Sequence, residues 1–485
     1  MELPGISTPA KSVDAPNPLV PTDIPTPVCG AADATPSAPW SATTRIAFRI
    51  AFLYFFCFVF LGANGTLLGV FPVVGGWIQD KLNWPLNHLS EFVGQHVFHL
   101  TGIAAHWHPS ESGDTTMNWI HDGLVLTFAL AGGILWTILS RIRNNPRTDY
   151  RTLHAWLRFF LRLTCAMFMI GYGLAKVFPF QMPPPSVAVL TEPAGNMAPM
   201  TFLWNLIGLS PVYEIICGSC EVLGGILLLY RRTALAGALF STFVVTNVVL
   251  YNFCYDVPVK LFAANLLLGC IFLALPDAVS LCRYFWSHKL TAPTAPWVPP
   301  ISRRAGRIAI LVTEIVFAVA FLVVRPIFMT IGWHQLQVAL RTPSPLVGAW
   351  HLDAAHPASG AFIAPTGLPV TDLYVAPSNR AYTRSSDGQL WLSGFGPDSK
   401  KHTVQISCYF IGGPTNYAWQ LSDPNHLVLT SVPPDPPKAD PKHPPVKPAA
   451  PFTPAVLTLT RTPTPAHYPL LERGFHFISE WRYER

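Results

Sequence analysis

Residues 211–230 read PVYEIICGSCEVLGGILLLY, an apolar run that is long enough to cross a bilayer and yet contains two carboxylates. Glu214 and Glu221 are seven residues apart, so they share one face of a helix. An ionisable group inside a membrane span is costly, and by default it marks a functional site or a structural ion pair. This stretch therefore predicts a polytopic membrane protein and indicates where its function is to be sought.

The composition agrees with this fold class. Half of the 485 residues are hydrophobic and only 12% are charged, whereas soluble domains average about 25% charged residues. The net charge of +6 is modest, so the expected partner is the lipid bilayer and not a nucleic acid. The nine cysteines are an odd number and lie mostly in apolar runs, which is not the pattern of a secreted disulfide framework.

Basic residues gather before the first apolar span and after the second, fourth and sixth. By the positive-inside rule, this alternation predicts a cytoplasmic N-terminus and a periplasmic or extracellular C-terminal domain. We expect a mainly α-helical, multi-pass protein of the bacterial plasma membrane. Seven spans are predicted, at residues 50–74, 119–139, 156–178, 211–230, 234–253, 258–275 and 308–333.

The spans divide the chain into segments of different character. We expect a disordered, Pro-rich N-terminal tail, two N-terminal spans with a His- and Trp-rich outer insert, a four-helix core, an inner connector, and a seventh span. A β-rich outer domain follows. In that order the segments are residues 1–44, 45–154, 155–286, 287–306, 307–334 and 345–485.

Several polar residues lie within or beside the four-helix core. Counting about 1.5 Å per residue from the span ends places nearly all of them in the outer half of the membrane, with Glu314 as the exception. We expect a polar cleft that is formed by spans three to six and opens outward, in which Lys176 pairs with Glu214 or Glu221; the alternative is that these residues only hold helices together. The candidate cleft residues are Tyr172, Lys176, Glu214, Glu221, Asn247, Asp256 and Lys260.

Two cysteines form a C-x-x-C motif in the fourth span. Cys217 and Cys220 are three residues apart, so on a helix they share a face. Such a pair could form a disulfide or exchange electrons with a lipid-soluble quinone. The alternative is that both are small hydrophobic residues of an apolar helix.

Residues 75–117 form the histidine-bearing insert. His96 and His99 would share a helix face and are candidates for a metal or proton site. The alternative is an amphipathic helix at the membrane interface, with tryptophans as its belt residues. At the end of the insert, either Asp114 or Thr115 is expected to be the N-cap of the second span.

Three motifs carry a resemblance to a known family: YGLAK at 172–176, GSCEVLGG at 218–225 and NFCYDVPVKL at 252–261. Over residues 112–285 the chain resembles the DoxX-like family of four-helix membrane proteins. That family is related to thiosulfate:quinone oxidoreductase subunits and to the surfeit and vitamin-K-carboxylase-type membrane domains. The resemblance implies a quinone-linked redox role, with a quinone as the cofactor.

The C-terminal domain has a different pattern. Eight short alternating runs between residues 346 and 461, separated by turn residues, predict an antiparallel β-sheet or a small barrel, with residues 431–454 as an extended Pro-rich loop. Gly348-Ala-Trp350 is similar to the start of a lipocalin-like barrel. That similarity implies a ligand cup, and a purely structural outer domain is the alternative.

Three functions remain open. The first is a membrane redox component in which Lys176 and Glu221 contact a quinone or another small molecule and Tyr172 donates a hydrogen bond to it. The second is a non-catalytic, membrane-anchored binding or assembly module whose outer β-domain carries the activity. Proton-coupled transport along the Glu214 and Glu221 face is a third, for which no internal repeat is found. The sequence leaves open whether the protein is an enzyme.

Overall fold

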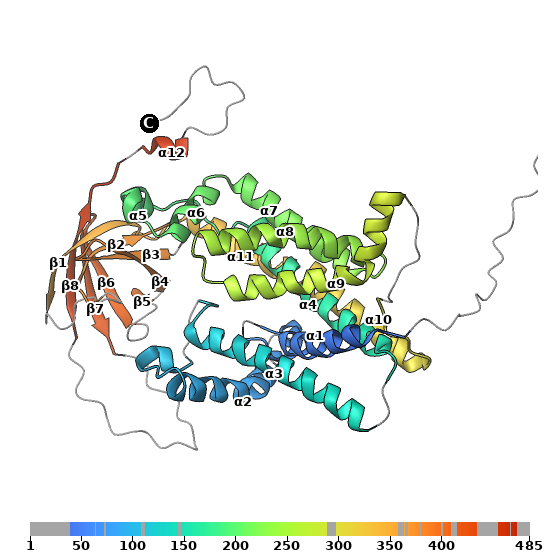
Figure 1. Ribbon diagram of the computed structural model, residues 1–485. Helices are drawn as coiled ribbons and strands as arrows, with labels where there is room; N and C mark the ends of the chain where they lie inside the picture. Colours follow the sequence, from blue (N-terminus) through green and yellow to red (C-terminus); the bar gives the residue numbers. More distant parts are fainter. Residues whose placement is uncertain are drawn as a thin grey trace, which may run out of the picture.

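The protein is seen here in a computed structural model, which consists of a helical bundle and a β-barrel (Figure 1). Most of the predicted tail 1–44, part of the connector 287–306 and nearly all of the loop 431–454 lie outside the described residues. The structure describes residues 39–63, 65–71, 74–107, 112–143, 147–288, 297–356, 363, 367–378, 380–398, 401–408, 415–433, 454–465 and 467–472.

Within these residues, seven helices are long and apolar enough to cross a membrane, which confirms the predicted number of spans. The first span lies at Ala42–Leu61 and not at the predicted residues 50–74, because the backbone becomes extended at Gly62 and the helix ends there. The barrel lies beside one end of the bundle (Figure 1). We call this end the barrel end and the opposite one the far end. The spans are α1 (Ala42–Leu61), α3 (Thr116–Ile142), α4 (Arg151–Val177), α7 (Pro211–Leu229), α8 (Ala234–Cys254), α9 (Lys260–Ser287) and the continuous pair α10 (Arg304–Val319) and α11 (Arg325–Arg341).

Helix α4 is the centre of the bundle. In its apolar window 78% of the residues are buried, whereas the corresponding share in the other spans is between 17% and 44%. It packs against α1, α7, α9 and the α10–α11 helix. Side chains on α4 are therefore shielded from lipid on most sides, which allows it to carry polar groups.

The last span is longer than a bilayer requires. From Arg304 to Arg341 it has 38 residues, or roughly 57 Å at the helical rise, against a hydrocarbon thickness of about 30 Å. It continues past the predicted boundary at 334 because the next proline is Pro343. A π-helical turn, η4 (Ala320–Val324), ends two residues before Pro326, which cannot donate the usual helical hydrogen bond.

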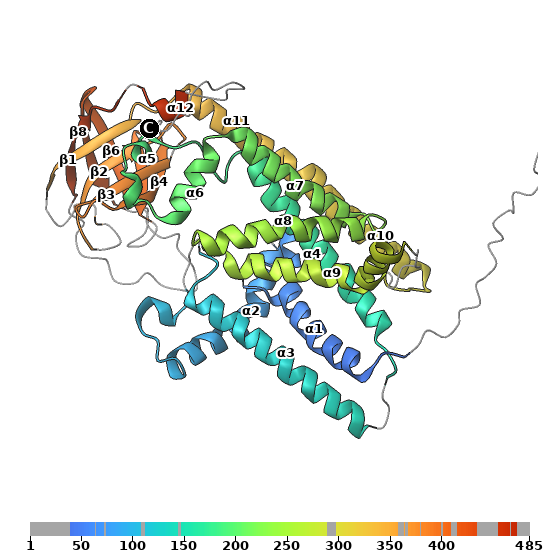
Figure 2. The ribbon, with the colours of Figure 1, turned by 45° about the horizontal axis from the view of Figure 1, so that its top comes forward.

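Further helices, all of them short except α2, connect and cover the spans. At the start of α3, the side chain of Thr115 accepts the backbone N–H of Asn118, so Thr115 is the N-cap. The insert is largely the helix α2, which lies beside α3 in both ribbon views (Figure 2). These elements are η1 (Leu67–Val70), α2 (Val74–His96), η2 (Gly102–Ala105), α5 (Val187–Leu190), η3 (Ala194–Asn196), α6 (Pro199–Gly208) and α12 (Pro469–Glu472).

The C-terminal domain is a closed antiparallel barrel in which each strand pairs with the next and β1 pairs with β8. Each of the eight predicted runs overlaps one strand, so the small-barrel alternative is confirmed. Trp350 is fully buried inside it. The strands are β1 (Gly348–His356), β2 (Val370–Val375), β3 (Arg380–Ser385), β4 (Leu390–Asp398), β5 (Thr403–Cys408), β6 (Thr415–Asp423), β7 (His426–Val432) and β8 (Val456–Thr462).

Candidate functional site

A buried ion pair lies at the barrel end of the bundle. The Nζ atom of Lys176, in the last turn of α4, is 2.9 Å from Oε2 of Glu221 in the middle of α7. The two side chains are only 4% and 6% exposed. Of the two carboxylates predicted as partners of Lys176, the structure selects Glu221. Removing one charge of such a pair would leave the other uncompensated in an apolar interior.

Two glycines bring the helices that carry this pair together. A Cβ atom on Gly173 of α4 would lie 2.7 Å from the carbonyl oxygen of Gly218 on α7, and one on Gly218 would lie 2.5 Å from the carbonyl oxygen of Gly173. The two backbones are thus in direct contact, as in small-residue packing of membrane helices. This contact lies one turn from both Lys176 and Glu221, and it sets the distance between them.

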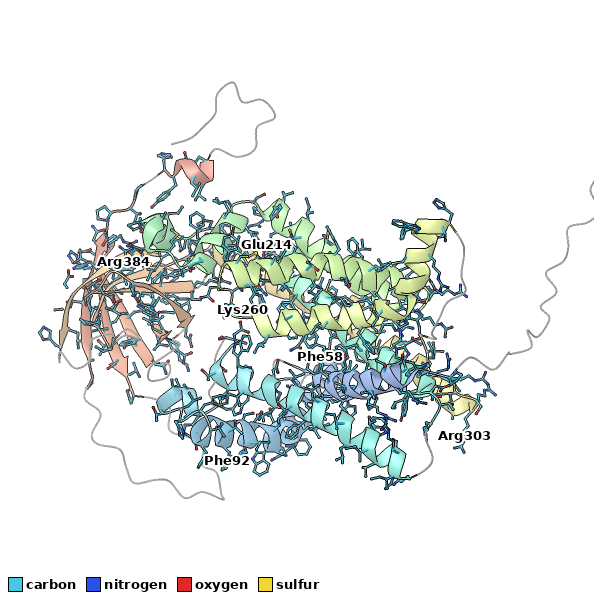
Figure 3. All side chains as sticks on the ribbon, in the orientation of Figure 1. Phe58, Phe92, Glu214, Lys260, Arg303 and Arg384 are labelled. Carbon is cyan, nitrogen blue, oxygen red and sulfur yellow. The ribbon has the colours of Figure 1, made fainter. Side chains whose placement is uncertain are left out.

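Glu214 is separate from the ion pair. Its side chain is fully buried in the first turn of α7, at the barrel end (Figure 3). Its Oε1 accepts the backbone N–H of Met182 at 3.0 Å, whereas Oε2 has no hydrogen-bond partner among the described residues. Glu214 therefore fastens the segment after α4 to the start of α7.

A cavity of about 690 Å³ lies against the ion pair. Its floor includes Lys176 and Glu221, and α6 covers it with apolar side chains such as Leu203 and Ile207. At its rim, Ile216 of α7 and Phe243 of α8 are 56% and 78% exposed. The cavity is therefore mostly apolar, has charged groups at its floor and opens beside exposed apolar side chains of two membrane-length helices.

A smaller cavity of about 50 Å³ touches the same ion pair. It is lined by Tyr172, by Tyr251 and by Asn252, whose Oδ1 atom lacks a hydrogen-bond partner among the described residues. Tyr251 lines both cavities. Sequence reasoning missed this tyrosine, although it directly precedes the motif at 252–261.

The predicted site residues separate into two groups. The larger cavity brings together Lys176, Glu214, Glu221, Asn247, Cys217 and Cys220, and the smaller one adds Tyr172. Both cysteines are free thiols of intermediate exposure. Asp256 and Lys260 line neither cavity.

Asp256 and Lys260 instead lie where the chain enters α9: Asp256 is in the turn before the helix and Lys260 is its first residue. They pair with each other at 2.7 Å, and the side chain of Asp256 is 80% exposed. The carboxylate of Asp114 accepts the backbone N–H groups of Lys260 and Leu261 at 2.7 and 3.0 Å. Asp114 therefore caps α9. The sequence suggests it as a cap of α3, where Thr115 takes that role.

The insert histidines also lie away from the cavities. His96 stacks on Phe92, with 4.3 Å between the ring centroids, and its Nδ1 lies 2.9 Å from the Phe92 carbonyl oxygen. His99 has a positive φ of 54°. In the part of the chain that the structure describes, no group of three or more His, Cys, Asp or Glu side chains is arranged to hold a metal ion.

The expectation that polar groups concentrate in the outer half, with Glu314 as the exception, is wrong. At the far end, Arg158 and Arg162 of α4 are fully buried and pair with Asp277 at 3.3 Å and with Glu314 at 2.5 Å. Arg162 also donates to the carbonyl of Leu229 at the end of α7. Two arginines four residues apart in an apolar run were the signal that could have revealed these pairs.

Comparison with known proteins gives a relative but no activity. The chain is 35% identical over 137 residues to the uncharacterised protein YwoB of Bacillus subtilis (strain 168), a match that covers 28% of this chain and 82% of YwoB. No family model matches the chain. No solved structure matches it.

Proposed function

This chain belongs to the same family as YwoB of Bacillus subtilis, and we propose that its helical core binds a quinone as part of a membrane redox system. The observation that carries the proposal is the buried Lys176–Glu221 pair at the floor of a mostly apolar cavity. A quinone has a polar head with two carbonyl oxygens and an apolar tail. The ammonium of Lys176 supplies a donor for a head oxygen, and the apolar wall and rim accommodate the tail.

The test is native mass spectrometry of the full-length protein extracted with its lipids. In the variant Lys176→Met/Glu221→Leu the buried ion pair is replaced by apolar groups, a change that often leaves folding intact. We expect wild type to retain a quinone and this variant to lose it. Asp256→Asn is the control, because the side chain of Asp256 is 80% exposed and lines neither cavity. If the double variant and wild type retained the quinone equally, the Lys176–Glu221 pair would serve only to hold α4 and α7 together.

The redox part of the proposal rests on the thiols of Cys217 and Cys220, which line the same cavity. Oxidation of the two thiols to a disulfide releases two electrons and two protons, and reduction of a quinone to a quinol takes up the same number of each. The two half-reactions therefore balance. A short-chain quinone added to the reduced protein is expected to yield one quinol per two thiols lost.

This yield should disappear in Cys217→Ser/Cys220→Ser. It should persist in Cys254→Ser/Cys282→Ser, because both of these cysteines are exposed and line neither cavity. If the protein retained a quinone but its thiols were not oxidised, the site would bind the quinone without reducing it.

We also propose that the N-terminus is cytoplasmic and that the barrel is on the opposite side of a bacterial plasma membrane. The part of the chain that the structure describes has seven spans before the barrel, an odd number, and the basic clusters follow the positive-inside rule. Epitopes placed at the two ends of the chain test this in spheroplasts. The C-terminal epitope should be accessible to antibody before lysis and the N-terminal one only after it.

The alternative is a binding or assembly module in which the barrel carries the activity. The barrel interior is filled by a cluster of buried apolar side chains around Trp350, including Leu373, Leu429 and Leu457. This filling argues against a deep ligand cup and leaves the outer surface of the barrel for binding. A barrel that captures a partner while the cavity variants have no effect would favour this alternative.

A further inference from the structure

A second large cavity lies at the far end of the bundle, away from the candidate quinone site. It has a volume of about 720 Å³ and lies between the last turns of α3 and the first turns of α4. Its apolar wall includes Leu135 and Leu139, which are 55% and 42% exposed on α3. Trp156 lines it from α4. An apolar wall that continues onto an exposed helix face is suited to a hydrocarbon chain.

The remaining lining is basic. Arg143, which follows α3, and Arg147, which precedes α4, both line the cavity and are exposed. Arg45 lies beside them, because its Nη1 donates to the backbone carbonyl of Arg147 at 3.4 Å. The acid closest in sequence, Asp149, is engaged by Arg151 at 3.3 Å. The mouth of the cavity is therefore positively charged.

A buried guanidinium adds to this charge. Arg49 of α1 is 4% exposed. It donates to the Tyr150 hydroxyl at 3.0 and 2.7 Å and to the Thr137 hydroxyl at 2.7 Å. Both partners are neutral, and within the described residues Arg49 forms no ion pair with a carboxylate. Tyr150 lines the cavity, so an uncompensated charge lies directly behind its wall.

Arg49 differs in this respect from the other fully or nearly fully buried cations of the bundle. Arg158, Arg162 and Lys176 each face a carboxylate within the chain. A buried charge without a counter-ion is costly. An anion in the neighbouring cavity would lower that cost, and the membrane supplies anions attached to hydrocarbon chains.

We propose that this cavity binds an anionic phospholipid. Arg143 and Arg147 hold the phosphate, since planar guanidinium groups match its oxygens, and the field of Arg49 reinforces the attraction. An acyl chain lies along the apolar wall of α3 towards Trp156. Basic pockets between membrane helices are suited to anionic headgroups. The site is independent of the quinone proposal because the two cavities share no residue.

The test is native mass spectrometry of the full-length protein exposed to equal amounts of phosphatidylglycerol and phosphatidylcholine of the same chain length. We expect wild type to retain phosphatidylglycerol preferentially. In Arg143→Gln/Arg147→Gln the retention should fall about fivefold for each guanidinium removed. The control is Arg303→Gln/Arg304→Gln, which removes two exposed arginines at the same end of the bundle without touching the cavity (Figure 3).

Three results would overturn the proposal. One is equal retention of the two lipids by wild type, a comparison that needs no variant and so does not depend on variant folding. Another is an equal effect of the two double variants. The third is competition by glycerol 3-phosphate as strong as that by phosphatidylglycerol, because a site for a free anion would not need the acyl chain.

Discussion

At the scale of single residues, the candidate site depends on two glycines more than on its charged groups. The approach of Gly173 to Gly218 places the backbones of α4 and α7 in contact and so brings Lys176 to Glu221. A sequence with alanine at either glycine would carry the same ion-pairing residues but would separate the helices. The distance between the two charged groups is thus set by two uncharged residues.

Gly218→Ala should therefore destabilise the protein by about 1–3 kcal/mol, the usual cost of inserting a methyl group where no space exists. The new Cβ atom would lie 2.5 Å from the carbonyl oxygen of Gly173. Thermal unfolding in detergent measures the effect. Gly171→Ala is the matched control on α4, because nothing lies within 4 Å of its added Cβ atom. Similar losses in both variants would contradict the close approach of α4 and α7.

The far-end ion pairs make a second prediction at this scale. Arg162→Met leaves Glu314 uncompensated and the carbonyl groups of Leu228 and Leu229 without their donor. We expect a loss of about 3–5 kcal/mol. Arg162→Met/Glu314→Leu should recover most of it, since an apolar pair leaves no buried charge. Unfolding of the three proteins in the same detergent gives the comparison, and a double variant no better than the single one would argue against this explanation.

At the scale of secondary-structure elements, β1 is held by interactions at its start. Trp350 is fully buried and donates its Nε1–H to the Leu346 carbonyl at 2.8 Å. The guanidinium of Arg461, on β8, lies 4.2 Å from the centre of the indole. It also donates to the carbonyls of Val347 and Pro424 at 2.9 and 2.7 Å. The Arg461 side chain thus links the segment that leads into β1 to β8, the strand that closes the barrel.

Arg461→Met should keep the packing on Trp350 and lose the hydrogen bonds. Bonds from a charged group contribute about 1.5–3 kcal/mol each, so the barrel should unfold at clearly lower denaturant concentration. Hydrogen exchange of β1 and β8 reports this locally. Lys401→Gln, an exposed change elsewhere on the barrel, is the control. Unchanged protection of β1 would show that strand pairing alone holds it.

The elements also show what a sequence can and cannot predict. Spans and strands follow from hydrophobic periodicity, which is local, and both predictions are confirmed. The partner of Lys176 could not be chosen between Glu214 and Glu221, because the choice depends on a helix crossing at Gly173. Likewise, Asp114 lies next to the start of α3 but caps α9, a contact between residues about 146 positions apart along the chain.

At the scale of the whole molecule, the barrel and the candidate cavity share one connecting segment. Arg384 of β3 pairs at 2.8 Å with Glu192, which follows α5 and has a side chain 4% exposed. Arg380 donates to the carbonyl of Phe180 at 3.1 Å. The same connection between α4 and α7 includes α6, whose side chains cover the cavity. Barrel position and cavity cover are therefore mechanically linked.

Arg380→Met/Arg384→Met should loosen the barrel from this connection and leave Glu192 buried without its cation. We expect faster hydrogen exchange in residues 187–208 and quicker release of any ligand from the cavity. Lys401→Gln again is the control. If exchange in this segment were unchanged, the barrel would not support the cover of the cavity.

The closed barrel affects how copies of the protein behave when many of them share one membrane. Copies in one membrane are confined to two dimensions with their barrels on the same side, so neighbouring domains meet far more often than in free solution. A sheet with an open edge would offer unpaired N–H and C=O groups to the next copy and could template strand exchange. Because β1 pairs with β8, each ring of strands has no such edge. The domain is thus suited to dense, lateral crowding without aggregation.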